Sequence, residues 1–142
     1  MVDLHSILLD HKAKKKKSDE ISHEQEGPSV TPTLSEIPDM FFDQILVEFK
    51  LGRIEILVLM YIYRMVYCRP NLYKVFGISP LLSHYEMAKT LVLEVPETIG
   101  AIHKLEELGF LSTIRAGQYF VRRCFTKEND EIFKQTYADF DL

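Results

Sequence analysis

The chain has few cysteines and no long hydrophobic run. Its two cysteines, Cys68 and Cys124, lie far apart and outside any CxxC pair, so we predict two buried thiols rather than a zinc site or disulfide framework. The longest apolar run, residues 56–63, is much shorter than a membrane span. Near the N-terminus the lysines follow a short apolar start, the reverse of a secretory signal. We therefore expect a soluble cytoplasmic protein without membrane attachment.

Acidic side chains outnumber basic ones. The chain carries 21 Asp and Glu against 17 Lys and Arg, a net charge of −4. Because binding along nucleic acid depends on neutralising phosphates, this balance argues against a protein that coats DNA or RNA, and any DNA contact must be local. The sequence also lacks a phosphate-binding glycine loop, an HExxH pair and a recognisable nucleophile context. We therefore predict no enzymatic activity, no cofactor and no metal site.

The composition changes near residue 36. Residues 10–36 are polar, contain prolines and serines and have no hydrophobic period, so we predict a disordered tail at 1–36. The 9 Phe and 7 Tyr of the chain and its 46% of hydrophobic residues suffice for one compact core. We therefore predict a single globular domain at 37–142.

Two features of the tail are candidates for binding. Leu4, Ile7 and Leu8 have helical spacing, which favours an amphipathic turn that docks residues 2–9 on a protein partner. An unstructured start is the alternative. Residues 14–17 are four lysines, which form either a solvated charge run or a tethered, salt-sensitive contact to DNA.

Two helices are predicted before residue 70. In residues 37–49, Pro38 suits a first helical turn, and apolar side chains recur at helical spacing at Phe42, Ile45, Leu46 and Phe49. After Gly52, residues 53–68 are apolar almost all round. A helix of that kind is either central to a core or part of an oligomer interface.

Residues 83–109 predict two short helices joined by a turn. Ser83 and Glu86 have the spacing of a capping box, which begins the first helix. Pro96 opens the second helix, where its missing N–H costs nothing, and Gly109 ends it. Two such helices form a helix-turn-helix.

The second helix has a polar outward face. At about 100° per residue, its inward side carries Ile99, Ile102 and Leu105, with Val95 and Thr98 near the edge. The outward side carries Glu97, Gly100, His103, Lys104 and Glu107. This outward side is the one that would meet a groove of DNA.

The stretch FLSTIRAGQYFVRRCF after Gly109 predicts a β-hairpin that turns at residues 116–118. Arg115 precedes the turn, Gln118 lies at its tip, and Arg122 and Arg123 follow. Alternation sends Arg122 and Arg123 to opposite faces, so we expect only one of them to reach a phosphate.

With two helices joined by a turn and then a hairpin, residues 83–125 resemble a winged helix-turn-helix. SHYEMAKTL is similar to the first helix of the motif, IHKLEELGFL to the end of its recognition helix and STIRAGQYFVRRCF to its wing. Upstream, IPDMFFDQIL and the apolar helix with ILVLMYIYR are similar to the N-terminal domains of phage and plasmid replication proteins. The resemblance implies a mainly α fold with a small β-hairpin and extra N- and C-terminal helices. It also implies a transcriptional regulator or replication-associated factor that binds double-stranded DNA.

The sequence departs from the family at three positions. Val92 occupies a turn where a small residue is usual, Val95 a position where a cap is common, and Gly100 a position that often carries a polar reader. Because each good bidentate base contact contributes about 1 to 3 kcal/mol of discrimination, we expect weak base readout. The DNA-binding residues that we predict are Lys89, Glu97, His103, Lys104, Arg115, Gln118, Arg122 and Arg123.

The C-terminal segment predicts a final helix. Acidic residues lie in its first turn, and side chains at near-helical spacing follow at Ile132, Phe133, Thr136, Tyr137 and Phe140. The family resemblance implies that such a helix packs on the first helix or builds a homodimer. Covering the protein's own core is the alternative.

A second hypothesis assigns the same fold to protein contacts. In that case the acidic recognition face and the Leu4, Ile7, Leu8 segment are docking surfaces. Lys89, Lys104 and Arg115 are then solvated surface charges, and His103 is inert. Net acidity favours this hypothesis, whereas the family resemblance favours DNA binding.

Overall fold

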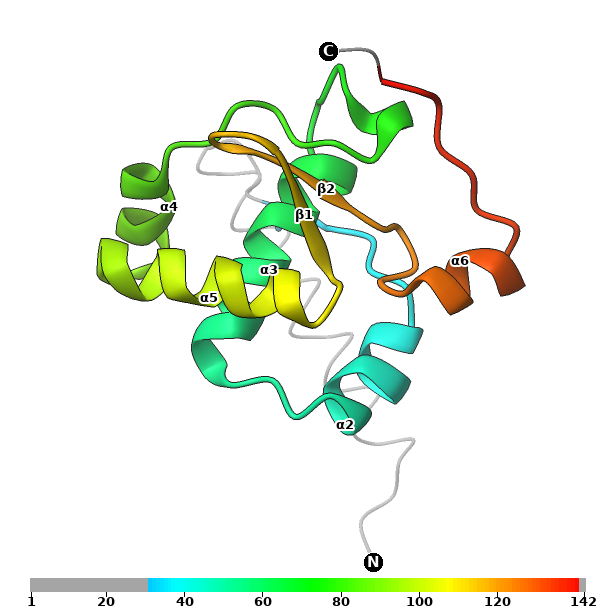
Figure 1. Cartoon of the computed structure of the whole chain (residues 1–142), viewed down its shortest axis with the longest axis horizontal. Helices are drawn as coiled ribbons and strands as arrows, with labels where there is room; N and C mark the ends of the chain where they lie inside the picture. Colours follow the sequence, from blue (N-terminus) through cyan, green and yellow to red (C-terminus); the bar gives the residue numbers. More distant parts are fainter. Residues whose placement is uncertain (1–30, 141–142) are drawn as a thin grey trace, which may run out of the picture. The chain divides into compact units, whose positions relative to one another are not determined.

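The computed structural model describes residues 31–140, and the compact unit that holds the helices and strands below begins at Ser35 (Figure 1). The predictions for the docking residues Leu4, Ile7 and Leu8 and for the lysines at 14–17 concern residues outside the described range. Within that range the protein is mainly helical with one small antiparallel sheet, as the sequence predicts.

The regular elements are helical segments and one hairpin, which lies between α5 and α6. In chain order they are η1 (Phe41–Ile45), α2 (Leu46–Glu48), α3 (Arg53–Tyr63), η2 (Arg64–Cys68), η3 (Lys74–Phe76), α4 (His84–Leu91), α5 (Val95–Glu107), β1 (Leu111–Arg115), β2 (Gln118–Val121) and α6 (Lys127–Ile132). The segments η1 and α2 are continuous, and so are α3 and η2. They form the two helices that the sequence predicts before residue 70.

Helix α3 is the centre of the core, which is one of the two roles that its apolar sequence allows. Val58, Leu59 and Ile62 are fully buried. The helix packs against α4, α5 and β2, and Figure 1 shows it behind α5 and the hairpin. Among residues 31–140, no helix combines the length and the apolar character that a membrane crossing requires.

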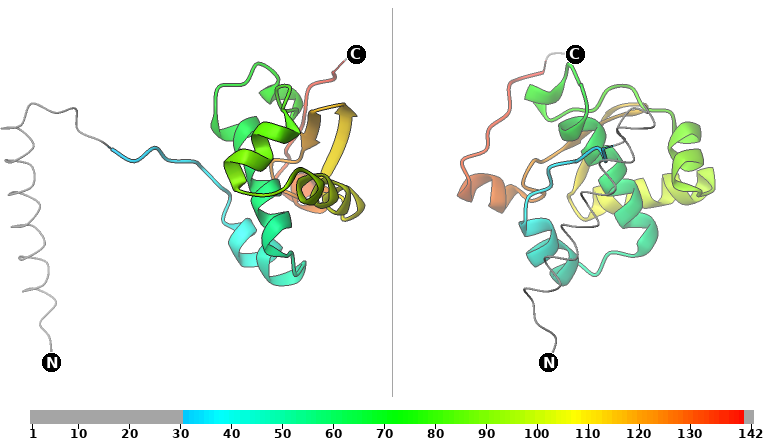
Figure 2. Two further views of the ribbon diagram at one scale, coloured as in Figure 1. Left: turned by 90° about the vertical axis from the view of Figure 1, so that its left-hand side faces the viewer. Right: turned by 180° about the vertical axis from the view of Figure 1, so that it is seen from behind.

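The first helix begins later than predicted, and Phe41 takes the inward position predicted for Phe42, whereas Ile45, Leu46 and Phe49 face the core as predicted. Its regular part starts at Phe41, whose N–H donates to the carbonyl oxygen of Pro38 at 3.0 Å. Phe41 and Ile45 are buried, whereas Phe42 is 52% exposed. The wider π-helical turn accounts for this difference, because it rotates Phe41 toward the core. In the view from behind, the segment that leads into η1 crosses the end of the continuous helix formed by α3 and η2 (Figure 2).

The hairpin is joined by a third segment that no sequence pattern predicts. Strands β1 and β2 pair in antiparallel fashion, with Leu111 opposite Val121. Residues 77–82 run along the other side of β2, where the Ser79 N–H donates to the Tyr119 carbonyl oxygen at 2.8 Å and Ile78 forms a bridge with Phe120. The segment carries too few strand-forming residues between Gly77 and Pro80 for its sequence to predict a strand.

The turn of the hairpin requires glycine at position 117. Gly117 has a φ of 80°, and an added Cβ would lie 2.5 Å from the carbonyl oxygen of Leu82. The same close approach lets the Leu82 N–H donate to the Gly117 carbonyl oxygen at 2.7 Å. The tip is therefore held against the loop that precedes α4.

The C-terminal helix is shorter than predicted. Helix α6 ends at Ile132, and Ile132 and Phe133 are exposed instead of forming an apolar inner face. Beyond it, Tyr137 packs edge-on against Phe120, and Phe140 packs against Tyr73 and Phe76. Tyr137 thus packs on the core from a segment without regular secondary structure, whereas Phe140 contacts aromatic rings outside the core. Helix α6 itself is tied to the first helix, because the Asn129 side chain donates to Oε1 of Gln44 at 3.0 Å.

The two cysteines differ in burial. Cys124 is buried, as predicted, whereas Cys68 is only half-buried. The Cys68 thiol lies at the end of η2 and donates to the carbonyl oxygen of Glu36 at 3.4 Å. Both are free thiols.

Replacing Val92 by glycine is expected to stabilise the fold. Val92 has φ 55° and ψ 50° and is 87% exposed, so a β-branched side chain occupies the left-handed region without burial to offset the strain. We predict that Val92→Gly raises the free energy of unfolding by about 1 kcal/mol. Urea unfolding would show a higher midpoint at an unchanged slope.

The matched control is Thr90→Gly in the last turn of α4, where the backbone is helical. Its expected effect is a loss of about 0.5 to 1 kcal/mol, because glycine there gains nothing from relieved strain. An unchanged or lower midpoint for Val92→Gly would contradict the assignment of strain to this turn.

Candidate functional site

Helix α5 presents an uncovered face among the described residues. Its buried side carries Thr98, Ala101, Ile102 and Leu105. The opposite side carries the exposed residues Pro96, Glu97, Gly100, His103, Lys104 and Glu107, which includes the whole outward set predicted from the sequence. The prediction for the inward side differs in one respect, since Ile99 is only half-buried and Thr98 takes its place in the core.

The start of α5 is fixed by two glutamates. Glu94 is the N-cap residue, so Val95 does not occupy the cap position that the family resemblance implies. The main-chain N–H of Glu94 donates to the Glu97 carboxylate at 3.1 Å, and the Thr98 hydroxyl donates to the Glu94 carbonyl oxygen at 3.1 Å. Glu97, the one carboxylate among the residues predicted to contact DNA, therefore serves the helix terminus.

Helix α4 begins as the sequence predicts. The Ser83 hydroxyl accepts a hydrogen bond from the Glu86 N–H at 3.3 Å. Lys89 lies exposed in the last turn, where a cation complements the helix dipole. Val92, the residue that follows α4, makes the left-handed turn toward α5.

Gln118 does not lie at the tip of the hairpin, contrary to the prediction. It is the first residue of β2, pairs with Arg115 and is fully buried. Its amide donates to the Ser79 carbonyl oxygen at 2.9 Å, and its own oxygen accepts from Nε of Arg115 at 2.7 Å. Gln118 therefore orients Arg115, which remains exposed, and has no surface to offer a base.

Arg122 and Arg123 lie beyond the end of β2, so strand alternation does not decide their directions. Nη1 of Arg122 is 3.1 Å from Oδ2 of the buried Asp130, and its guanidinium lies over the Phe120 ring at 5.3 Å. The Arg123 guanidinium lies over the Tyr67 ring at 5.6 Å from its centroid. Arg122 is thus paired inside the compact unit, whereas the Arg123 guanidinium rests on an aromatic ring, so the prediction that only one of the two reaches a phosphate stays a prediction.

The charges around α5 are predominantly negative. Residues 83–118 carry five carboxylates and three cations, namely Glu86, Glu94, Glu97, Glu106 and Glu107 against Lys89, Lys104 and Arg115. Arg122 is paired with Asp130, and Arg123 lies beside the segment at 35–39, so neither adds to the charges of this region. The face can attract phosphate only locally, at its three cations.

His84 joins α4 to the hairpin, a role that the sequence did not reveal. Its Nε2 is hydrogen-bonded to the hydroxyl of Tyr119 on β2. Burial, reinforced by the Glu106 carboxylate, raises the pKa of Tyr119 above its ordinary value. On the same side the Thr113 hydroxyl donates to the Glu106 carboxylate. These contacts fix the hairpin to α4 and α5, and only a knowledge of strand register would have predicted them.

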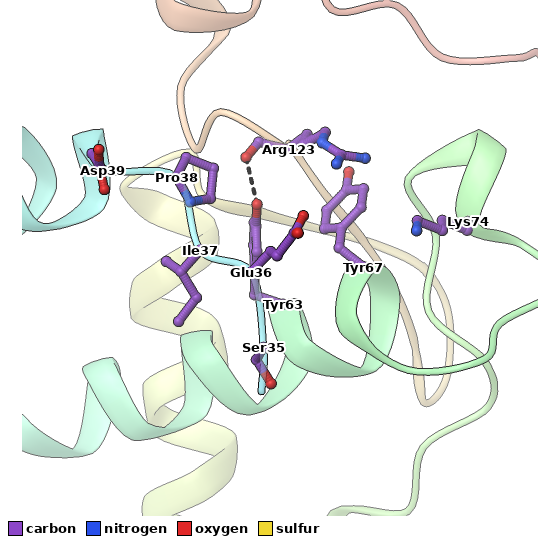
Figure 3. A pocket seen from close by; sticks show the side chains of 9 residues that line it. All are labelled: Ser35, Glu36, Ile37, Pro38, Asp39, Tyr63, Tyr67, Lys74 and Arg123. Atoms are coloured by element: carbon purple, nitrogen blue, oxygen red, sulfur yellow. Dashed lines mark hydrogen bonds between the residues drawn. The ribbon is translucent and has the colours of Figure 1, made fainter. Parts of the chain in front are cut away.

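A cavity of about 560 Å³ lies between the segment at 35–39, the end of the long helix and Arg123 (Figure 3). The Tyr63 hydroxyl donates to the Arg123 carbonyl oxygen at 2.7 Å, and the Tyr67 hydroxyl donates to that of Val121. Burial raises the pKa of both tyrosines. Because their protons are committed to main-chain acceptors, these hydroxyls act as structural ties. No residue of α4, α5 or the two strands lines this cavity.

Asp130 is expected to be the most important polar residue for stability in this region. It is 3% exposed and accepts hydrogen bonds from Arg122, from the Tyr137 hydroxyl at 2.7 Å and from the Cys124 N–H at 3.2 Å. We predict that Asp130→Ala lowers the free energy of unfolding by about 3 kcal/mol and Tyr137→Phe by about 1 kcal/mol.

Chemical denaturation of the wild type and of the two variants would measure these losses. Asp139→Ala is the matched control, because Asp139 is exposed, and its effect should stay within about 0.5 kcal/mol. Equal stability of Asp130→Ala and Asp139→Ala would refute the structural role of Asp130.

The predicted site residues fall into two groups. Lys89, Glu97, His103, Lys104 and Arg115 are exposed on α4, α5 and the hairpin, while Gln118, Arg122 and Arg123 make contacts inside the unit. No family model, curated protein or solved structure matches the chain. The function is therefore inferred from the arrangement of these residues.

Proposed function

We propose that residues 53–121 form a winged helix-turn-helix that binds duplex DNA through α5 and the tip of the hairpin. The order of the elements carries the proposal: a core helix, a short paired segment at 77–82, two helices joined by a turn, and a hairpin whose second strand pairs with that segment. This is the arrangement expected of a winged helix. The protein would serve as a transcriptional regulator or as a replication-associated factor.

The exposed face of α5 has the shape that a major groove admits. An α-helix fits that groove, and the outward side of α5 is free of cover from the described residues along its length. Lys89, Lys104 and Arg115 are the cations available for phosphate. Three such contacts give a slope of log K against log salt of about −2.7 per protomer. Stable binding at physiological salt then requires a homodimer or the additional lysines at 14–17.

Base readout from this face is weak. His103 and Lys104 are its hydrogen-bond donors, because Pro96 and Gly100 occupy the neighbouring outward positions and Glu97 serves the helix cap. A protein of this kind recognises DNA mainly through its backbone and shape.

A second candidate function is protein binding by the same face. The excess of carboxylates over cations between residues 83 and 118, together with the pairing of Arg122 with Asp130, favours it. In that case the partner surface would be basic. The segment with Leu4, Ile7 and Leu8 would be a further docking element, and the hypothesis predicts no salt-dependent affinity for DNA.

Fluorescence anisotropy with a labelled duplex of about 30 base pairs, titrated from about 50 mM to about 200 mM salt, separates the two candidates. We predict that Lys104→Ala and Arg115→Ala each weaken binding and each reduce the salt slope by about 0.9. The removal of one phosphate contact is the physical reason.

Lys127→Ala and Arg64→Ala are the matched controls, because both side chains are exposed and lie outside α4, α5 and the hairpin. They should leave the slope unchanged. Absence of wild-type binding at the lowest salt would end the DNA proposal, and equal effects of site and control substitutions would show that the contact surface lies elsewhere.

A further inference from the structure

Gly100 has no role in the fold that the described residues reveal. Of the other described glycines, Gly77, Gly109 and Gly117 have positive φ angles, and Gly52 precedes α3 with the Glu55 carboxylate 2.7 Å from the position of an added Cβ. Gly100 differs from all of them. It lies inside α5, and an added Cβ would meet nothing within 4 Å.

A glycine in that position weakens the helix. It loses more backbone freedom on folding than alanine does and contributes no side chain. Among the described residues, neither backbone conformation nor packing requires a glycine here, which leaves room for a close approach to α5 from outside.

The surroundings of Gly100 fit such an approach. At about 100° per residue, Pro96, Gly100, His103 and Glu107 lie within one narrow stripe, opposite the buried side of α5. Lys104 lies beside this stripe, and Gly100 interrupts it between Pro96 and His103. At residue 100 the stripe therefore has no projecting side chain. One turn further on, His103 and Lys104 offer hydrogen-bond donors.

We infer that Gly100 is the point of closest approach between α5 and the duplex, where the main chain of the helix contacts the sugar-phosphate wall of the groove. This inference rests on the proposed DNA binding and deepens it. The contact is one of shape, because an interior turn of a helix has no free N–H to donate. Its consequence is that Lys104 and His103 reach the backbone and base edges that a larger residue 100 would hold away.

Stability and binding should change in opposite directions when Gly100 is replaced. Gly100→Ala is expected to raise the thermal midpoint by roughly 2 to 6 °C, because alanine favours the helix and meets no neighbour. Its affinity for the duplex at low salt should fall by roughly fivefold or more, and Gly100→Leu should fall further, because overpacking grows with side-chain size.

Thr136→Ala is the control, because Thr136 is exposed and lies outside α5 and the hairpin. It should change neither quantity. If wild-type protein binds the duplex and Gly100→Ala binds equally well or better, the inference is wrong while the proposed function stands. A lowered thermal midpoint for Gly100→Ala would also overturn it, because glycine would then serve the fold. If the wild type does not bind, the proposed function fails.

Discussion

A helix that is apolar on nearly every side is stable only when other elements cover all of it. Helix α3 imposes this requirement on the whole unit. Its Tyr63 ring stacks on Phe125 at 4.6 Å between centroids, and Phe125 in turn contacts Phe41 of the first helix at 5.2 Å. Phe125 adopts a φ of 71° to reach that position, and its complete burial in the aromatic stack offsets the strained backbone. The chain beyond β2 is placed by this stack.

The electrostatic character of the α5 face follows from the same packing. The C-terminal segment brings Asp130 and Tyr137 beside the residues that follow β2, and these groups engage Arg122 and the main chain of Arg123. Positive charge that the sequence places next to the hairpin is thereby used to hold α6. What remains around α5 is a surface with more carboxylates than cations, which can bind phosphate at particular points but does not attract DNA from a distance.

Sequence patterns predicted the helices and the hairpin well because those elements depend on local signals. Ser83 caps α4, Gly109 follows α5 with a positive φ, and Gly117 turns the hairpin. Long-range contacts were beyond such signals. The pairing of residues 77–82 with β2, the burial of Gln118 and the attachment of Arg122 to Asp130 each join positions that no periodicity connects. The outward set of α5 was predicted because it depends only on helical geometry, whereas the direction of Arg122 could not be predicted because it depends on Asp130 of α6.

The main-chain hydrogen bond between Leu82 and Gly117 has a mechanical consequence. Leu82 immediately precedes Ser83, the cap of α4, so the hairpin tip and the first turn of α4 share one short stretch of main chain. A displacement of the tip therefore acts on the first turn of α4 through this hydrogen bond. A molecule that binds Arg115, next to the tip, would pull on α4 as well.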